Sequence, residues 1–78
     1  MNSEKIREIL SPHANWHALE IEGDGYHFQI HCASLIFEGK NTLARQRYIY
    51  QFLKDYIADG SLHAVEIKAY TPTEWDKK

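Results

Sequence analysis

The run of residues 63–70 constrains the fold more than any other part of the chain. Its apolar residues recur at every second position, so Val65, Ile67 and Ala69 share one face of an extended strand. His63 occupies the next position of the same row, where an imidazole is costly to desolvate unless its polar atoms find partners. The run therefore predicts a strand that is covered on one face, and a histidine that is either a satisfied core residue or functional.

Two earlier segments predict a β-hairpin. Apolar and polar side chains alternate over residues 19–22 and again over residues 26–32, where Tyr26 starts the apolar row. Between them, Gly23-Asp24-Gly25 supplies residues that favour a tight turn. Each segment is typical of a strand with one face towards solvent.

Helical patterns occupy the rest of the chain. Ser3 is the expected N-cap of a first amphipathic helix that Pro12 stops. Asn41 or Thr42 is the expected cap of a long helix that ends at Gly60. Residues 71–74, Thr-Pro-Thr-Glu, predict a capping box that opens a short final helix.

The order of these elements predicts an α+β fold with a three-stranded mixed sheet and helices on one face. The hairpin makes strands one and two antiparallel, and the helical crossover makes strands two and three parallel. If strands two and three are neighbours, their N-terminal ends lie together. This places His63 beside the turn at residues 23–27.

Length and composition exclude several classes of protein. A chain of 78 residues predicts one domain spanning residues 1–78. The net charge of −2 provides no overall attraction for nucleic acid, although local basic patches remain possible. A single cysteine, Cys32, and the lack of a long apolar run or signal sequence predict a cytoplasmic protein without a membrane span.

Several separated blocks together resemble the BolA family, most closely its IbaG branch. The resemblance covers residues 17–76 and rests on Gly23-Asp24-Gly25, His27-Phe28, Phe37-Glu38-Gly39-Lys40, Arg45-Gln46-Arg47, His63-Ala64, Thr71-Pro72 and Trp75. It implies a single BolA-like domain with the class II KH-like αββααβ arrangement. This arrangement agrees with the topology expected from the pattern of elements.

The resemblance also implies a partner. Proteins of this family pair with monothiol CGFS-type glutaredoxins and share a [2Fe-2S] cluster, for which the glutaredoxin cysteine and glutathione supply the other ligands. The family's invariant histidine matches His63, which is therefore expected to bind iron. Neutral imidazole suits iron, and replacing a thiolate by histidine raises the cluster potential. The isolated protein is expected to carry no cofactor and to be a monomer or weak homodimer, while cluster transfer and sensing both stay open.

A second protein ligand is less well defined. Many family members carry a cysteine or histidine in the first hairpin loop, where this chain has Asp24. Asp24 and His27 are the local candidates, although Asp in such a turn more often forms the turn. His27 is the weaker second metal ligand of this prediction. Cys32 falls in an apolar row and is expected to be buried, and His13, His17 and His31 are expected at the surface.

A transcriptional regulator that binds nucleic acid through the KH-like fold is the alternative function. Lys40, Arg45 and Arg47 would then contact phosphates, or they would dock a protein partner, or form a solvated helix face. They are expected near the predicted site. Residues 39–42 lack the second glycine of the KH loop, which weakens this alternative. No catalytic motif is present, so the chain is not expected to be an enzyme.

Overall fold

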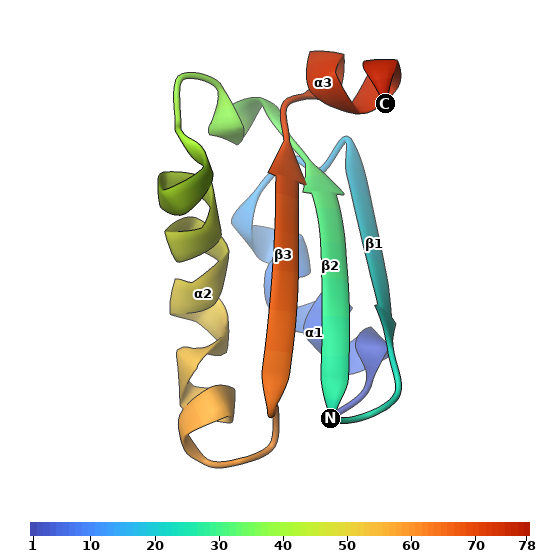
Figure 1. The fold of residues 1–78 in the computed structure, drawn as a ribbon, viewed down its shortest axis with the longest axis vertical. Helices are drawn as coiled ribbons and strands as arrows, with labels where there is room; N and C mark the ends of the chain where they lie inside the picture. The colour runs from blue at the N-terminus through green and yellow to red at the C-terminus, as the bar shows by residue number, and fades with distance from the viewer.

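Three strands form a single mixed sheet, which helices and 3-10 turns connect (Figure 1). The structure, a computed structural model, describes all of residues 1–78. In chain order the elements are α1 (Ser3–Leu10), a 3-10 turn (Ser11–His13), β1 (Ala18–Gly23), β2 (His27–Ala33), a second 3-10 turn (Leu35–Phe37), α2 (Thr42–Ala58), β3 (Ala64–Tyr70) and α3 (Pro72–Lys77).

The sheet has the strand order β1-β2-β3, with β2 in the centre. β1 pairs with β2 in antiparallel orientation, and β2 pairs with β3 in parallel orientation. The predicted mixed sheet is therefore confirmed. The short helix α3 lies beyond the C-terminal end of β3, at the top of Figure 1, rather than on the face that α1 covers.

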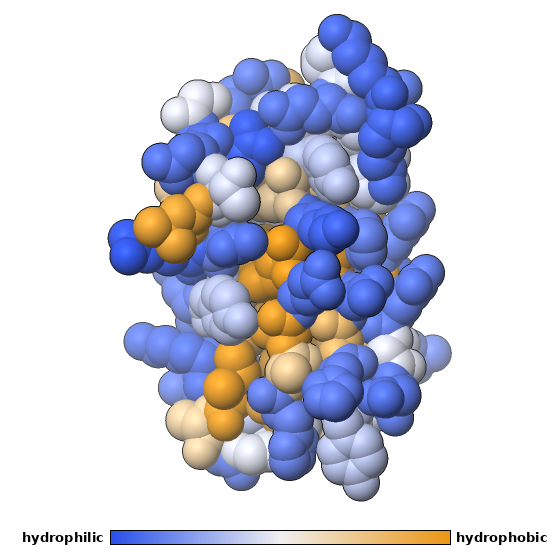
Figure 2. Space-filling model, viewed as in Figure 1, coloured by the Kyte–Doolittle hydropathy of each residue, from blue (hydrophilic) through white to orange (hydrophobic).

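Alternation along the strands gives the sheet one buried and one open face. Ile21, Ile30 and Ile67 lie side by side across the three strands and pack in the core that α1 and α2 cover. The ten buried core residues are Ile6, Leu10, Phe28, Ile30, Cys32, Phe37, Ile49, Leu53, Leu62 and Ile67. Figure 2 shows the opposite, open face, which is mostly hydrophilic apart from an apolar band between α2 and β3.

Side-chain caps fix where the helices begin. The N-cap of α1 is Asn2, whose Oδ1 accepts a hydrogen bond from the Lys5 amide at 2.8 Å, so the prediction of Ser3 is wrong by one residue. Asn41 caps α2 in the same way. The predicted capping box at Thr71 and Glu74 is confirmed in full.

Two strands are shorter at their N-terminal ends than the alternation predicts. β2 begins at His27 and β3 begins at Ala64, which leaves Tyr26 and His63 just outside the sheet. Both residues are solvent-exposed, because they belong to the turns that lead into the strands. None of the helices combines the length and the apolar character that crossing a bilayer requires.

Candidate functional site

The parallel register of β2 and β3 brings His63 to the hairpin turn, as the topology predicts. His27 lies opposite Ala64, and the Ala64 amide donates a hydrogen bond to the carbonyl of Tyr26 at 3.1 Å. The ring of Tyr26 meets the ring of His63 edge-on, with 5.3 Å between the centroids. We call these two residues, with Asp24, the turn rim.

His63 is exposed, so the first of the two alternatives for this residue, a satisfied core histidine, is wrong. Leu62 is the residue that closes this end of the core, with no exposed surface, and its amide donates to the Tyr56 carbonyl. Because Leu62 turns inward immediately before β3, the next side chain points to solvent. The imidazole of His63 makes no hydrogen bond to the rest of the chain, and its nitrogens are free to bind an external group.

Asp24 shapes the turn rather than presenting a free carboxylate. Its Oδ1 accepts hydrogen bonds from the amides of Tyr26 and His27, each at 2.9 Å. These bonds, that of His27 foremost, lower the pKa of the Asp24 carboxyl. The geometry matches the turn-forming role that was one of the two alternatives for this residue.

His27 lies on the open face of the sheet, in a hollow of about 500 Å³ whose lining includes Glu22, Gln29 and Glu66. Its opposite residue on β3 is Ala64, whereas His63 precedes β3 and lies against the ring of Tyr26 in the turn. No group of three or more histidine, cysteine, aspartate or glutamate side chains could hold a metal ion within the chain. A metal at His63 would therefore need ligands from outside the protein.

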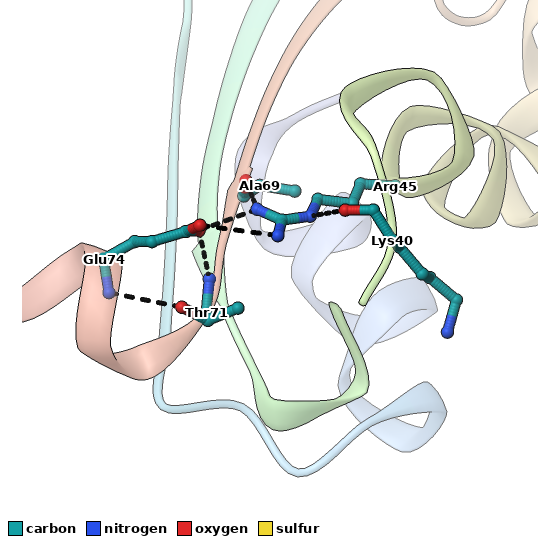
Figure 3. A network of polar contacts seen from close by, with 5 residues as sticks. All are labelled: Lys40, Arg45, Ala69, Thr71 and Glu74. Atoms are coloured by element: carbon teal, nitrogen blue, oxygen red, sulfur yellow. Dashed lines mark hydrogen bonds and ion pairs between the residues drawn. The ribbon is translucent and has the colours of Figure 1, made fainter. Parts of the chain in front are cut away.

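The basic residues lie at the other end of the sheet, so the expectation that they neighbour the predicted site is wrong. The helix α2 starts where β2 ends, and Arg45 consequently reaches Ala69 at the C-terminal end of β3 (Figure 3). Its guanidinium also donates to the Lys40 carbonyl and pairs with Glu74 at 2.7 Å. The Arg45 side chain is only 14% exposed, which differs from the solvated helix face that was one alternative.

The other two basic residues differ in how firmly they are held. The ammonium group of Lys40 donates to the Ile36 carbonyl at 2.8 Å. Arg47 is exposed and makes no hydrogen bond or ion pair within the chain. Of the three cations, Arg47 is the one that is free to meet a partner.

The remaining cysteine and histidine residues have structural surroundings. Cys32 is fully buried, as predicted, and burial raises the pKa of its thiol to about 12, so it is an inert core residue. His17 pairs with Asp76 at 2.9 Å, and His13 stacks on Phe52. Each of these two histidines is at the surface, as expected, but each also joins distant parts of the chain.

Tyr26 is the residue at the turn rim that the sequence pattern misassigned. Period-two counting places it in the apolar row of Phe28, yet 63% of its surface is exposed. The signal that could have found it is the parallel pairing itself, because a strand register that aligns His27 with Ala64 aligns Tyr26 with His63.

Comparison with known proteins identifies the family. A protein-family model described as BolA-like protein matches residues 5–74. Acid stress protein IbaG from Escherichia coli K12 is 39% identical over 75 residues, which cover 96% of this chain and 89% of the relative. BolA1 from Arabidopsis thaliana has a TM-score of 0.83 at 33% identity and covers 95% of this chain and 96% of its own. A BolA homologue from Coxiella burnetii has a TM-score of 0.82 at 30% identity, with 97% of each chain covered. The chain therefore belongs to the BolA-like family, in its IbaG-like branch.

Proposed function

We propose that this protein is an adaptor that binds a monothiol CGFS glutaredoxin and shares a [2Fe-2S] cluster with it, His63 supplying an iron ligand. The observation that carries the proposal is the exposed imidazole of His63, which makes no intramolecular hydrogen bond. The resemblance matches this residue to the family's invariant histidine. The name of the Escherichia coli relative, an acid stress protein, supports a role in the response to stress.

The donor set of the chain fits a shared cluster better than a resident one. A [2Fe-2S] cluster needs four protein or thiol ligands, and the chain has no cluster of three candidate ligands anywhere. Cys32 is buried and its raised pKa keeps it protonated, so the chain offers no thiolate. A partner that supplies a cysteine thiolate and glutathione would provide the ligands that the chain lacks beside His63.

The turn rim defines what this chain contributes to such a complex. The hydrogen bonds that the Tyr26 and His27 amides donate to Asp24 stabilise the hairpin turn, and this turn places Tyr26 against His63. The cluster, once shared, supplies one-electron redox chemistry, and imidazole ligation makes its retention sensitive to protonation. His27 lies opposite Ala64 on the open face of the sheet and is the weaker candidate for a second ligand.

Nothing specific favours the nucleic-acid alternative. Arg45 and Lys40 donate to backbone carbonyls, and Arg45 is also paired with Glu74, which leaves Arg47 as the one unengaged cation of the set. A single arginine provides little of the phosphate neutralisation on which nucleic-acid affinity depends. We therefore do not propose DNA as a ligand.

Anaerobic reconstitution with a CGFS glutaredoxin, iron, sulfide and glutathione tests the proposal. Native mass spectrometry should show a heterodimer that carries the cluster, and the visible spectrum should differ from that of the glutaredoxin alone. His63→Ala should lose the altered spectrum and shorten the lifetime of the cluster, because one iron ligand is gone. His31→Ala, on the open face, is the matched control and should behave as the unchanged protein.

The same experiment identifies the second ligand. If His27 binds iron, His27→Ala should shorten the cluster lifetime as His63→Ala does. An unchanged spectrum and lifetime in His63→Ala would refute the assignment of His63. Failure to form any heterodimer would refute the adaptor function itself.

A further inference from the structure

The two edges of the sheet differ in whether their outward backbone groups are hydrogen-bonded. In β3, the residues whose backbone groups point away from β2 are Val65, Ile67 and Ala69, because the alternate residues bond to β2. Each outward carbonyl accepts a hydrogen bond from a side chain of α2. The donors are Tyr50 to Val65 at 3.2 Å, Gln46 to Ile67 at 3.4 Å and Arg45 to Ala69 at 3.1 Å.

These bonds close the β3 edge to further strands. A strand added to an edge needs alternating free carbonyls and amides, and on β3 the carbonyls are already engaged. The side chains that engage them also stand between β3 and any incoming chain.

The β1 edge has no such cover. The Asp24 amide donates to the His27 carbonyl, so alternate residues of β1 bond to β2 and the ones between them point outward. Leu19, Ile21 and Gly23 are these outward residues, and no side chain bonds to their backbone groups. No segment of the chain lies beyond β1 in Figure 1.

The side chains of β1 indicate which kind of strand could pair with its free edge. Glu20 and Glu22 are exposed on the open face, while Leu19 and Ile21 face the core side and are only partly buried. A second copy of this chain is a poor occupant, since antiparallel pairing of two β1 strands about Ile21 would set Glu20 against Glu22 of the other copy. A strand with basic and apolar residues in alternation would instead meet opposite charge on one face and apolar surface on the other.

We propose that the β1 edge binds an extended segment of a partner protein in which basic residues alternate with apolar ones, by addition of a fourth strand. The free backbone groups of Leu19, Ile21 and Gly23 provide the hydrogen bonds. Glu20 and Glu22 select the charge of the segment. The surface adjoins the turn rim at Gly23, but the proposed strand addition does not depend on a cluster.

Capped nine-residue peptides provide the test. A peptide of alternating lysine and valine should bind the full-length protein and slow the hydrogen exchange of the Leu19, Ile21 and Gly23 amides, measured by NMR. The outward amides of Val65, Ile67 and Ala69 should keep their exchange rates, and they serve as an internal control. A glutamate-valine peptide of equal length should not protect β1, because its charges repel Glu20 and Glu22.

Charge reversal on β1 tests the selection. The double variant Glu20→Lys/Glu22→Lys should weaken binding of the lysine-valine peptide by about tenfold and permit binding of the glutamate-valine peptide. Glu4→Lys/Glu8→Lys on α1 changes the net charge equally and should leave both affinities unchanged. If the reversal variant fails to fold, Glu20→Gln/Glu22→Gln provides the smaller loss of affinity.

Several results would overturn the proposal. These are no binding of the lysine-valine peptide, equal binding of both peptides, or protection at Val65 and Ile67 in place of β1. Protection of β1 that rises with protein concentration in the absence of peptide would show that a second copy is the occupant.

Discussion

At the scale of the residue, two neighbours have opposite surroundings. Leu62 is completely buried and fixes the chain at the base of the core, while His63 is exposed against the ring of Tyr26. The edge-on contact shields one flank of the imidazole and limits the directions from which it is reached. The availability of His63 therefore depends on Tyr26 as well as on the fold.

Removal of the Tyr26 ring should expose His63 further. We expect Tyr26→Ala to raise the rate of carbethoxylation of His63 by diethylpyrocarbonate roughly threefold or more, since an aromatic pair contributes about 1 kcal/mol. Peptide mapping by mass spectrometry measures the rate at this histidine alone. Tyr26→Phe keeps the ring and should react as the unchanged protein does. An equal rate in all three proteins would show that the ring does not shield His63.

The sequence pattern predicted the place of these residues but not their environment. Counting by twos is valid only inside a strand, and Tyr26 and His63 lie one position before β2 and β3 begin. The buried row starts at Phe28 in β2 and at Val65 in β3, and counting by twos wrongly extended it to Tyr26 and His63. The caps at Asn41 and Thr71 were predicted well because capping is local, although the cap of α1 was predicted one residue too late. The burial of Cys32 was predicted well because this residue lies within β2, where alternation holds.

At the scale of the element, Arg45 joins three parts of the chain. It links α2 to the loop at Lys40, to the end of β3 at Ala69 and to α3 at Glu74 (Figure 3). The capping box at Thr71 could be predicted from the local sequence, but this contact could not, because Arg45 and Glu74 are 29 residues apart and no periodicity relates them.

Loss of the Arg45 guanidinium should destabilise the whole fold. We expect Arg45→Met to lower the free energy of unfolding by about 2 kcal/mol, because two backbone carbonyls lose a charged donor in a site that is little exposed. Urea denaturation measures the change. Arg47→Met, on an exposed position of the same helix, is the control and should change stability by less than about 0.5 kcal/mol. Equal stability of both variants would contradict a structural role for Arg45.

Acid should weaken the attachment of α3. The hydrogen bond from Arg45, and then that of the Thr71 amide, lower the pKa of Glu74 below its ordinary value of 4.5. A carboxyl group with a depressed folded pKa contributes stability that is fully present above its unfolded pKa. This contribution is lost as the pH falls below 4.5 and through the folded pKa.

Glu74→Gln isolates this contribution from that of other carboxyls. Urea midpoints of the unchanged protein and the variant should differ by a constant amount at neutral pH and converge as the pH falls below 4.5. Asp24 and Asp59 also have lowered pKa values, and their effects cancel because both proteins contain them. A difference that stays constant down to pH 3 would show that the pKa of Glu74 is not depressed.

At the scale of the whole molecule, the connections between strands predicted the position of the site better than the side-chain pattern did. The hairpin and the helical crossover together require a mixed sheet, and this rule brought His63 to the hairpin turn. The same rule, applied to α2, would have placed Arg45 and Arg47 far from His63, since a crossover helix begins where the preceding strand ends. The error arose because the basic residues were judged by sequence motif and not by the direction of their helix.

The molecule should unfold as one unit, although α3 contains no buried residue. Trp16 packs against Phe37 in the core, and Trp75 packs against Tyr70 at the far end of β3, so the two tryptophans report on different regions. Because Arg45 and the capping box couple α3 to the sheet, we expect each single-tryptophan variant, Trp16→Phe or Trp75→Phe, to show the same urea midpoint by fluorescence and by circular dichroism. In an Arg45→Met background the fluorescence of Trp75 should change at lower urea than the circular dichroism does. Separate midpoints without that substitution would show that α3 is an independent unit, and that the Arg45 contact does not extend the cooperative fold to the C-terminus.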